Sequence, residues 1–191
     1  MALVYPLLLG LFLAPLLGGD LRRLADLRLR ATRLIYLALT LQLVAFPVGA
    51  MPWQPSDTTA VVLWLASYAC LAAATGINIR LGGMPLIAAG LVANLAAIVA
   101  NGGHMPVLPA AMRAAGRSYH VHFNSAAASA PHLPWLVDRW AVPDWIPLAN
   151  VFSVGDVLIA LGGVLFPLVA TGACRLPASR AAGAEARLSP R

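Results

Sequence analysis

Long stretches without a charged residue constrain this chain more than any other feature of its sequence. Such runs cover residues 1–19, 34–56, 58–79 and 157–174, and another extends from 81 to beyond 101. Hydrophobic residues make up 60% of the 191 residues and charged residues only 10%, whereas soluble domains carry roughly 25% charged residues. A soluble core could not enclose that much apolar surface. The sequence therefore predicts an integral membrane protein, with lipid as the solvent for most of its surface.

The charge-free runs predict a single bundle of five transmembrane helices. The expected fold is an all-α membrane protein with a short extracytoplasmic cap between the fourth and fifth helices. We expect one transmembrane domain over residues 1–175 and a disordered cytoplasmic tail over 176–191. Residues 1–19 show neither the basic start nor the small-residue cleavage site of a signal peptide, which favours an uncleaved first helix. The expected spans are about 3–18, 33–50, 59–77, 84–101 and 154–174, with the outer cap over 102–150.

The 13 positive charges, all of them arginine, predict the orientation of the bundle. Alternation of the five spans places ten arginines on one side and three on the other. Because cytoplasmic loops carry an excess of positive charge, we expect the N-terminus outside and the C-terminus in the cytoplasm. The net charge of +6 lies in short stretches between spans rather than on one folded surface, which argues against nucleic-acid binding. The inner arginines are Arg22, Arg23, Arg28, Arg30, Arg33, Arg80, Arg175, Arg180, Arg187 and Arg191, and the outer ones are Arg113, Arg117 and Arg139.

Two connections between the spans have distinctive compositions. Residues 20–33 interleave arginine with leucine, which predicts a short helix lying along the lipid headgroups. The outer cap contains Trp135, Trp140 and Trp145, and tryptophan is typical of the membrane–water interface. We expect the cap to fold onto the outer helix ends, with short helices over 107–116 and 132–140.

All four histidines lie in the cap, at His104, His120, His122 and His132. A zinc site needs three or four ligands in a fixed geometry, and no acidic or cysteine partner stands near them in sequence. The two cysteines are a hundred residues apart in apolar surroundings and fit small apolar filler. The sequence therefore predicts no metal site and no cofactor.

Two motifs at the outer ends of the fourth and fifth helices define the candidate site. Residues 101–106 read Asn-Gly-Gly-His-Met-Pro, in which the glycines supply the positive φ of a helix C-cap and proline prevents continuation. Residues 150–156 read Asn-Val-Phe-Ser-Val-Gly-Asp, in which Ser153 fits an N-cap and Asp156 the third residue of a capping box. Asp156 is thus either a helix-starting residue or a functional carboxylate surrounded by amides. The binding candidates are Asn101, Gly102, Gly103, His104, Asn150, Ser153 and Asp156.

These two motifs and the arginine- and leucine-rich loop after Gly18-Gly19 together resemble a bacterial membrane-protein family, domain-of-unknown-function family 5317. Residues 135–138 and the Ile146-Pro147 pair look like the outward loop of that family, except that Val137 stands where glycine is frequent. The resemblance covers nearly the whole chain. It implies the bacterial cytoplasmic membrane and implies no activity.

A fainter likeness is to the prolipoprotein signal peptidases, which are aspartyl peptidases. Their last helix opens with Asn-x-Ala-Asp, whereas here Asn150 and Asp156 are six residues apart. Their other motif is Asn-x-x-Asp-Arg, and here Asp138-Arg139 is preceded by Trp135 instead of asparagine. Half of each motif is missing.

Two functions of different classes follow from these residues. The first is a non-enzymatic membrane protein, embedded in the lipid bilayer, whose outer face binds a partner membrane protein, a lipid headgroup or a small solute. The second is a hydrolase acting on a lipid-linked or peptide substrate, with Asp156 and Asp138 as the candidate catalytic residues. Gln42 and Asn94 lie within the predicted spans, where we expect them to make interhelical hydrogen bonds.

Overall fold

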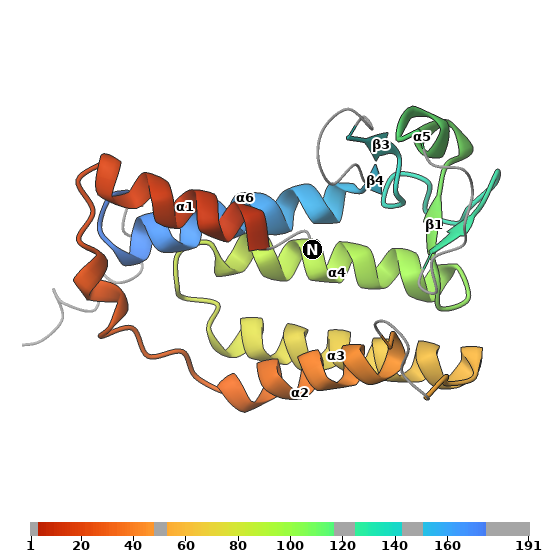
Figure 1. The fold of residues 1–191 in the computed structure, drawn as a ribbon, viewed down its shortest axis with the longest axis horizontal. Helices are drawn as coiled ribbons and strands as arrows, with labels where there is room; N and C mark the ends of the chain where they lie inside the picture. The colour runs from red at the N-terminus through yellow and green to blue at the C-terminus, as the bar shows by residue number, and fades with distance from the viewer. Residues whose placement is uncertain (1–3, 48–52, 117–124, 143–150, 175–191) are drawn as a thin grey trace, which may run out of the picture.

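The computed structural model describes residues 4–47, 53–116, 125–142 and 151–174. Within these residues the chain is mostly helical, as the sequence predicts. Five apolar helices run side by side, and a small cap of short strands and one short helix covers one end of them (Figure 1). The five helices are α1 (Val4–Leu16), α2 (Thr32–Ala45), α3 (Asp57–Ile77), α4 (Met84–Ala100) and α6 (Val154–Ala170).

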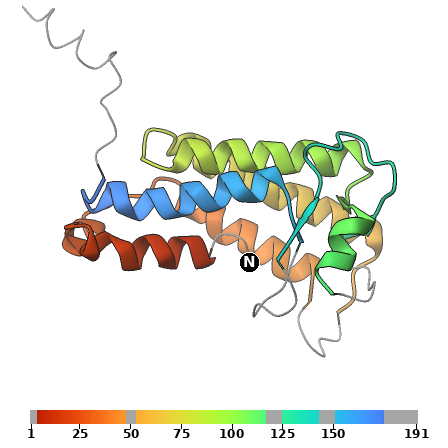
Figure 2. The same ribbon diagram turned by 90° about the horizontal axis from the view of Figure 1, so that it is seen from above.

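The helices do not pack in the order of the sequence. Helix α6 packs between α1 and α4, α4 also packs against α3, and α3 packs against α2. Figure 2 shows the same arrangement from above, with α1, α6 and α4 as neighbours. The last helix therefore lies between two others, one of which precedes it by more than 50 residues.

Glycines let the backbones of α4 and α6 come into direct contact. A Cβ added to Gly90 would collide with the carbonyl oxygen of Gly155, and one added to Gly155 would lie 2.7 Å from the carbonyl oxygen of Gly90. Two helical turns away, a Cβ on Gly162 would lie 2.6 Å from the carbonyl oxygen of Gly83. These two facing pairs show that the helices are antiparallel, and small residues at such crossings permit close packing.

The helices differ most from the predicted spans at two ends. Helix α2 ends at Ala45 rather than near residue 50, because Pro47 lacks a backbone N–H and disfavours helical geometry in the residue before it. Helix α6 ends at Ala170 rather than 174, where Gly172 has a φ of +79°.

Among the described residues, one helix, Asp57–Ile77, is long and apolar enough to cross a membrane by length and composition. The other four apolar helices are shorter, with 10–17 residues each.

The connection between α1 and α2 does not form the expected interfacial helix. It contains a single 3₁₀ turn, η1 (Leu21–Leu24), capped by the carboxylate of Asp20. Further along, the Asn78 side chain at the end of α3 accepts a hydrogen bond from Arg30 N (2.9 Å) and donates one to Arg30 O (2.8 Å). This pair of bonds fixes the arginine-rich segment to the same end of the bundle as the α3–α4 turn.

The cap contains short strands that the sequence does not predict. Strand β1 (Met105–Val107) pairs in parallel with β2 (Ser125–Ala127), and β3 (Trp140–Ala141) pairs antiparallel with β4 (Val151–Phe152). Helix α5 (Pro109–Ala114) confirms the helix expected over 107–116. The helix expected over 132–140 is wrong, because Leu133 has a φ of +52° and the chain turns there instead.

Candidate functional site

A capping box begins α6 at the cap end of the bundle, as the sequence predicts. The Asp156 backbone N–H donates to Ser153 Oγ (3.1 Å), and the Ser153 backbone N–H donates to Asp156 Oδ2 (3.0 Å). The carboxylate also lies at the positive end of the helix dipole, which stabilises a negative charge. These contacts hold Asp156 in one place at the start of α6.

Asn94 of α4 completes the cluster around this carboxylate. Asn94 Nδ2 donates to Asp156 Oδ1 (3.0 Å). The Ser153 hydroxyl lies 2.8 Å from Asn94 Oδ1 and 3.0 Å from Asp156 Oδ2, and its one proton serves one acceptor at a time. The missing side chain of Gly155 makes the contact possible, because a Cβ there would lie 2.6 Å from Asn94 Cγ. The interhelical hydrogen bond predicted for Asn94 is confirmed.

Tyr68 of α3 borders the same cluster. Its ring packs edge-on against Trp64 with centroids 5.7 Å apart, and its side chain also packs against the buried residues Leu91 of α4 and Ile159 of α6. The interhelical hydrogen bond predicted for Gln42 is also confirmed, because Gln42 Nε2 of α2 donates to Ser67 Oγ of α3 (3.1 Å). The cluster is therefore bounded by three helices.

Asp138 brings a second carboxyl group from the cap. Its backbone is fixed beside β1, because Asp138 N donates to Pro106 O (3.0 Å) and Leu108 N donates to Asp138 O (2.9 Å). The residue is only 7% exposed. Within the described part of the chain, its Oδ1 atom is buried and has no hydrogen-bond partner.

The protonation of Asp138 is coupled to Asp156. Burial of the carboxyl group is the largest cause, and the negative charge of Asp156 the second, of a pKa raised from 3.8 to about 7. At neutral pH, Asp138 is therefore close to the midpoint between a neutral acid and a carboxylate. A buried acid next to a charged one can donate or accept a proton, whereas an ordinary exposed aspartate can only accept.

The predicted site residues of the first motif lie elsewhere. Asn101 ends α4, but its side chain donates to Ala97 O (2.8 Å) and His132 O (2.9 Å) and accepts from His132 N (2.8 Å). Asn101 thus fastens the cap to α4, and the amide at Asp156 is that of Asn94. The positive φ values predicted for Gly102 (+73°) and Gly103 (+92°) are confirmed.

His104 also lies apart from Asp156. Its Nε2 atom is 3.2 Å from Oδ1 of Asp57, which belongs to the first turn of α3. Asn150, His120 and His122 lie outside the described residues, as does the tail over 176–191. In the part of the chain that the structure describes, no group of three or more His, Cys, Asp or Glu side chains is placed to hold a metal ion.

Sequence reasoning identified Asp156, Ser153 and Asp138 but not the part that Asn94 plays. The available signal was the spacing of the glycines, at 83 and 90 at the start of and within α4, and at 155 and 162 in α6. A seven-residue spacing in both helices predicts two facing pairs in an antiparallel crossing. The pair at Gly90 and Gly155 then places Asn94, one turn beyond Gly90, beside the start of α6.

Comparison with known protein families shows which family the chain belongs to. A family described as "Family of unknown function (DUF5317)" matches residues 26–168. The chain belongs to this family. No curated protein and no solved structure matches it. Membership in DUF5317 confirms the resemblance drawn from the two motifs, and it assigns no activity.

The matched region of this DUF5317 protein runs from just before α2 to near the end of α6, so it includes the whole Asn94–Ser153–Asp156 cluster and Asp138. Chemically, the two carboxyl groups differ. Asp156 accepts hydrogen bonds on both oxygens, whereas Asp138 has one buried oxygen without a partner among the described residues. The arrangement offers one fixed negative charge and one buried carboxyl group with a free acceptor.

Proposed function

We propose that this DUF5317 protein is a multi-pass protein of the bacterial cytoplasmic membrane that binds a small solute or a lipid headgroup at its extracytoplasmic face. The ligand carries a cationic or hydrogen-bond-donating group that pairs with Asp138. The observation that carries the proposal is the buried Oδ1 atom of Asp138, which lacks a partner among the described residues and lies within the electrostatic reach of Asp156.

The exposed surface of the helices supports the membrane location. Large apolar side chains are exposed on every one of the five helices, among them Phe12 (66%), Leu43 (59%), Val62 (58%), Val99 (60%) and Leu161 (54%). Soluble proteins rarely expose contiguous apolar surface on this scale, whereas lipid covers it without cost. Helices of 13 and 17 residues are about 20 and 26 Å long. They fit a bilayer that thins locally around a short helix.

The arginine distribution supports a five-span topology with the N-terminus outside and the C-terminus in the cytoplasm. Ten of the 13 arginines lie in or beside the α1–α2 and α3–α4 connections or follow α6 in the sequence. The cap and the Asp138–Asp156 pair then face the outside of the cell.

The energetics of Asp138 favour a ligand site over a purely structural role. Leaving a buried polar atom without a partner costs roughly 1–3 kcal/mol, and more for a charged group. Native structures contain few such groups, and each needs an explanation. A ligand that donates a hydrogen bond to Oδ1 would remove this penalty in the bound state.

A second function is favoured by the difference between the two carboxyl groups. General acid–base catalysis uses pairs of titratable groups whose environments separate their pKa values, and the pKa of Asp138 is raised to about 7. In a hydrolase, the neutral Asp138 would donate a proton to the leaving group, and Asp156 would accept one from the attacking water. This alternative requires both carboxyl groups to touch the same substrate.

Co-purification tests the binding proposal. The protein is extracted from bacterial membranes in mild detergent, and bound molecules are detected as added mass by native mass spectrometry. We expect a bound molecule on the wild-type protein that Asp138→Asn no longer retains, since the amide changes the charge and the acceptor at the site. Asp26→Asn, at an exposed aspartate far from the cap, is the matched control and should retain it. Equal retention by both variants would contradict the proposal.

The Asp156→Asn variant separates the effect of the charge on ligand binding from its effect on stability. The Asn94 amide can turn over so that it donates to Ser153 Oγ and accepts from the new amide, which preserves the hydrogen-bond number. Only the charge–dipole contribution is lost, roughly 0.3–1 kcal/mol. We expect a nearly unchanged melting temperature together with loss of the bound molecule. Retention of the bound molecule by this variant would return Asp156 to a helix-starting role.

A further inference from the structure

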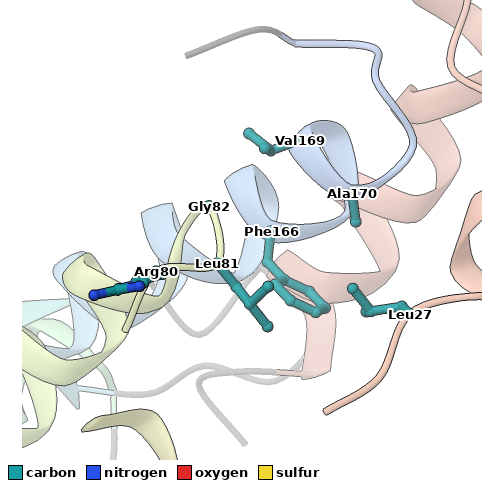
Figure 3. Close-up of a pocket in the computed structure, with 7 residues that line it drawn as sticks. All are labelled: Leu27, Arg80, Leu81, Gly82, Phe166, Val169 and Ala170. Carbon is teal, nitrogen blue, oxygen red and sulfur yellow. The ribbon is translucent and has the colours of Figure 1, made fainter. Parts of the chain in front are cut away.

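A cavity lies at the opposite end of the bundle from the cap. It has a volume of about 250 Å³ and is bounded by Leu27 before α2, by the α3–α4 turn and by the last turns of α6. Figure 3 shows the side chains of Leu27, Leu81 and Phe166 gathered together, with Arg80 extending from the far edge. The cavity is therefore an apolar slot with one cationic side chain at its rim.

Glycine at position 82 creates the shape of this slot. A Cβ on Gly82 would lie 2.5 Å from Val169 Cγ1, so the turn rests directly on α6. The residues Leu27, Leu81, Phe166 and Val169 are each partly exposed, which means that the slot opens to the surface of the bundle. Pockets that enclose a whole drug-sized ligand are about 300–1,000 Å³, so this one would hold part of a larger molecule.

The same end of the bundle carries an excess of positive charge without carboxylate partners. Arg80 is exposed, and five further arginines lie in or just after the connection between α1 and α2, which Asn78 fastens beside the α3–α4 turn. Asp20 and Asp26 are the only acidic residues of that connection, and the Asp20 carboxylate caps η1. Among the residues that the structure describes, the single ion pair joins His104 and Asp57 at the other end.

The geometry points to an anionic phospholipid as the occupant of this slot. Its phosphate group pairs with Arg80 and the neighbouring arginines, and the first part of an acyl chain lies on Leu81, Phe166 and Leu27. Charge complementarity selects the headgroup, because a basic pocket beside membrane helices on the cytoplasmic side matches an anionic lipid. The lining favours a lipid over free phosphate, because Arg80 is the only charged or polar side chain among its described residues and the other lining residues suit an acyl chain. The inference goes beyond the outer site, and rests on the proposed membrane location and orientation.

Lipid exchange tests the proposal with defined probes. The full-length protein is reconstituted in nanodiscs that contain equal amounts of phosphatidylglycerol and phosphatidylcholine, and the lipids that remain after detergent extraction are counted by native mass spectrometry. We expect phosphatidylglycerol to be retained over phosphatidylcholine. Arg80→Gln should lower this retention about fivefold, the factor expected for one arginine near an anionic surface.

Two pairs of variants separate the slot from general effects of charge and size. Arg113→Gln removes one positive charge from α5 in the cap, and should retain the lipid as the wild type does. Ala170→Leu fills the slot without a change of charge and should abolish lipid retention. Its control is Ala89→Leu, which adds the same volume at an exposed position of α4. Equal retention by all four variants, or equal retention of the two lipids, would overturn the proposal.

A third arm distinguishes a lipid from free phosphate. Inorganic phosphate at millimolar concentration should leave phosphatidylglycerol retention unchanged. Displacement of the lipid by phosphate, with the same dependence on Arg80, would show a soluble-anion site and overturn the lipid assignment. Membrane fractionation of each variant reports separately on membrane insertion, so failure of the lipid site and failure of the proposed location give different results.

Discussion

Replacement of Asp138 by asparagine should remove the pH dependence that this residue gives to the stability of the protein. The carboxyl group has a pKa of about 7 in the fold, against 3.8 when it is solvated. Because the pKa is raised on folding, the folded state holds a proton that the unfolded chain has released between these two values. The free energy of unfolding therefore decreases as pH rises from about 4 to about 7, and is constant above that range.

The size of the effect follows from the pKa shift. One pH unit within the range corresponds to about 1.4 kcal/mol, so the shift from 3.8 to about 7 amounts to about 4 kcal/mol in total. An experiment between pH 5 and 8 covers about 3 kcal/mol of this. For a chain of this size, 1 kcal/mol shifts the melting temperature by roughly 2–4 °C, which gives about 6–12 °C.

The assay compares melting temperatures of the wild type and Asp138→Asn in the same detergent at several pH values. The melting temperature of the variant should rise relative to that of the wild type as pH increases from 5 to 8. At the upper end of this range, the variant should be the more stable of the two. Subtracting the two curves cancels the contributions of the other titratable groups, which are present in both proteins. Asp26→Asn, exposed and far from the cap, should give a flat difference curve. A constant difference for Asp138→Asn, or one that falls with pH, would refute the buried, Asp156-coupled state of Asp138.

Two further outcomes follow from packing and topology. Gly155→Ala should lower the free energy of unfolding by roughly 1–3 kcal/mol, because its Cβ would collide with α4. In contrast, Gly76→Ala meets no atom within 4 Å and should be neutral or stabilising by up to about 1 kcal/mol; equal melting temperatures for the two variants would contradict the close helix crossing. In a Cys70→Ser background, a membrane-impermeant maleimide added to intact cells should label Ser129→Cys, at an exposed position of the cap, and should label Cys174 only after permeabilisation. The reverse pattern would overturn the orientation.

The features predicted correctly from the sequence are those encoded locally. The five helices follow from charge-free runs, and the α6 capping box follows from Ser153 and Asp156, three residues apart. The end of α4 follows from Asn101 and the two glycines after it. Each of these sequence patterns lies within one helix or one turn. It can therefore be interpreted without knowing which helices are neighbours.

The features that sequence reasoning missed depend on contacts between distant segments. An interhelical hydrogen bond was predicted for Asn94, but its partner was not. Asp156 is 62 residues away and comes close because α4 and α6 cross antiparallel at glycine pairs. The strands of the cap have two or three residues each, too few to show an alternating pattern. The burial of Asp138 depends on its position beside Val107 of β1, which the composition of a loop does not reveal.

Asp156 stabilises the folded protein and Asp138 destabilises it, and this contrast supports a functional role for the pair. Asp156 improves the fold, since it caps α6 and accepts hydrogen bonds from Asn94 and Ser153. Asp138 works against the fold above neutral pH, because its charge would be buried, with one oxygen unpartnered among the described residues. An apolar or amide side chain at position 138 would fill the same space at lower free energy. A residue that destabilises the native state in this way is expected where a ligand or a proton is to be bound, because functional sites are where proteins depart from optimal stability.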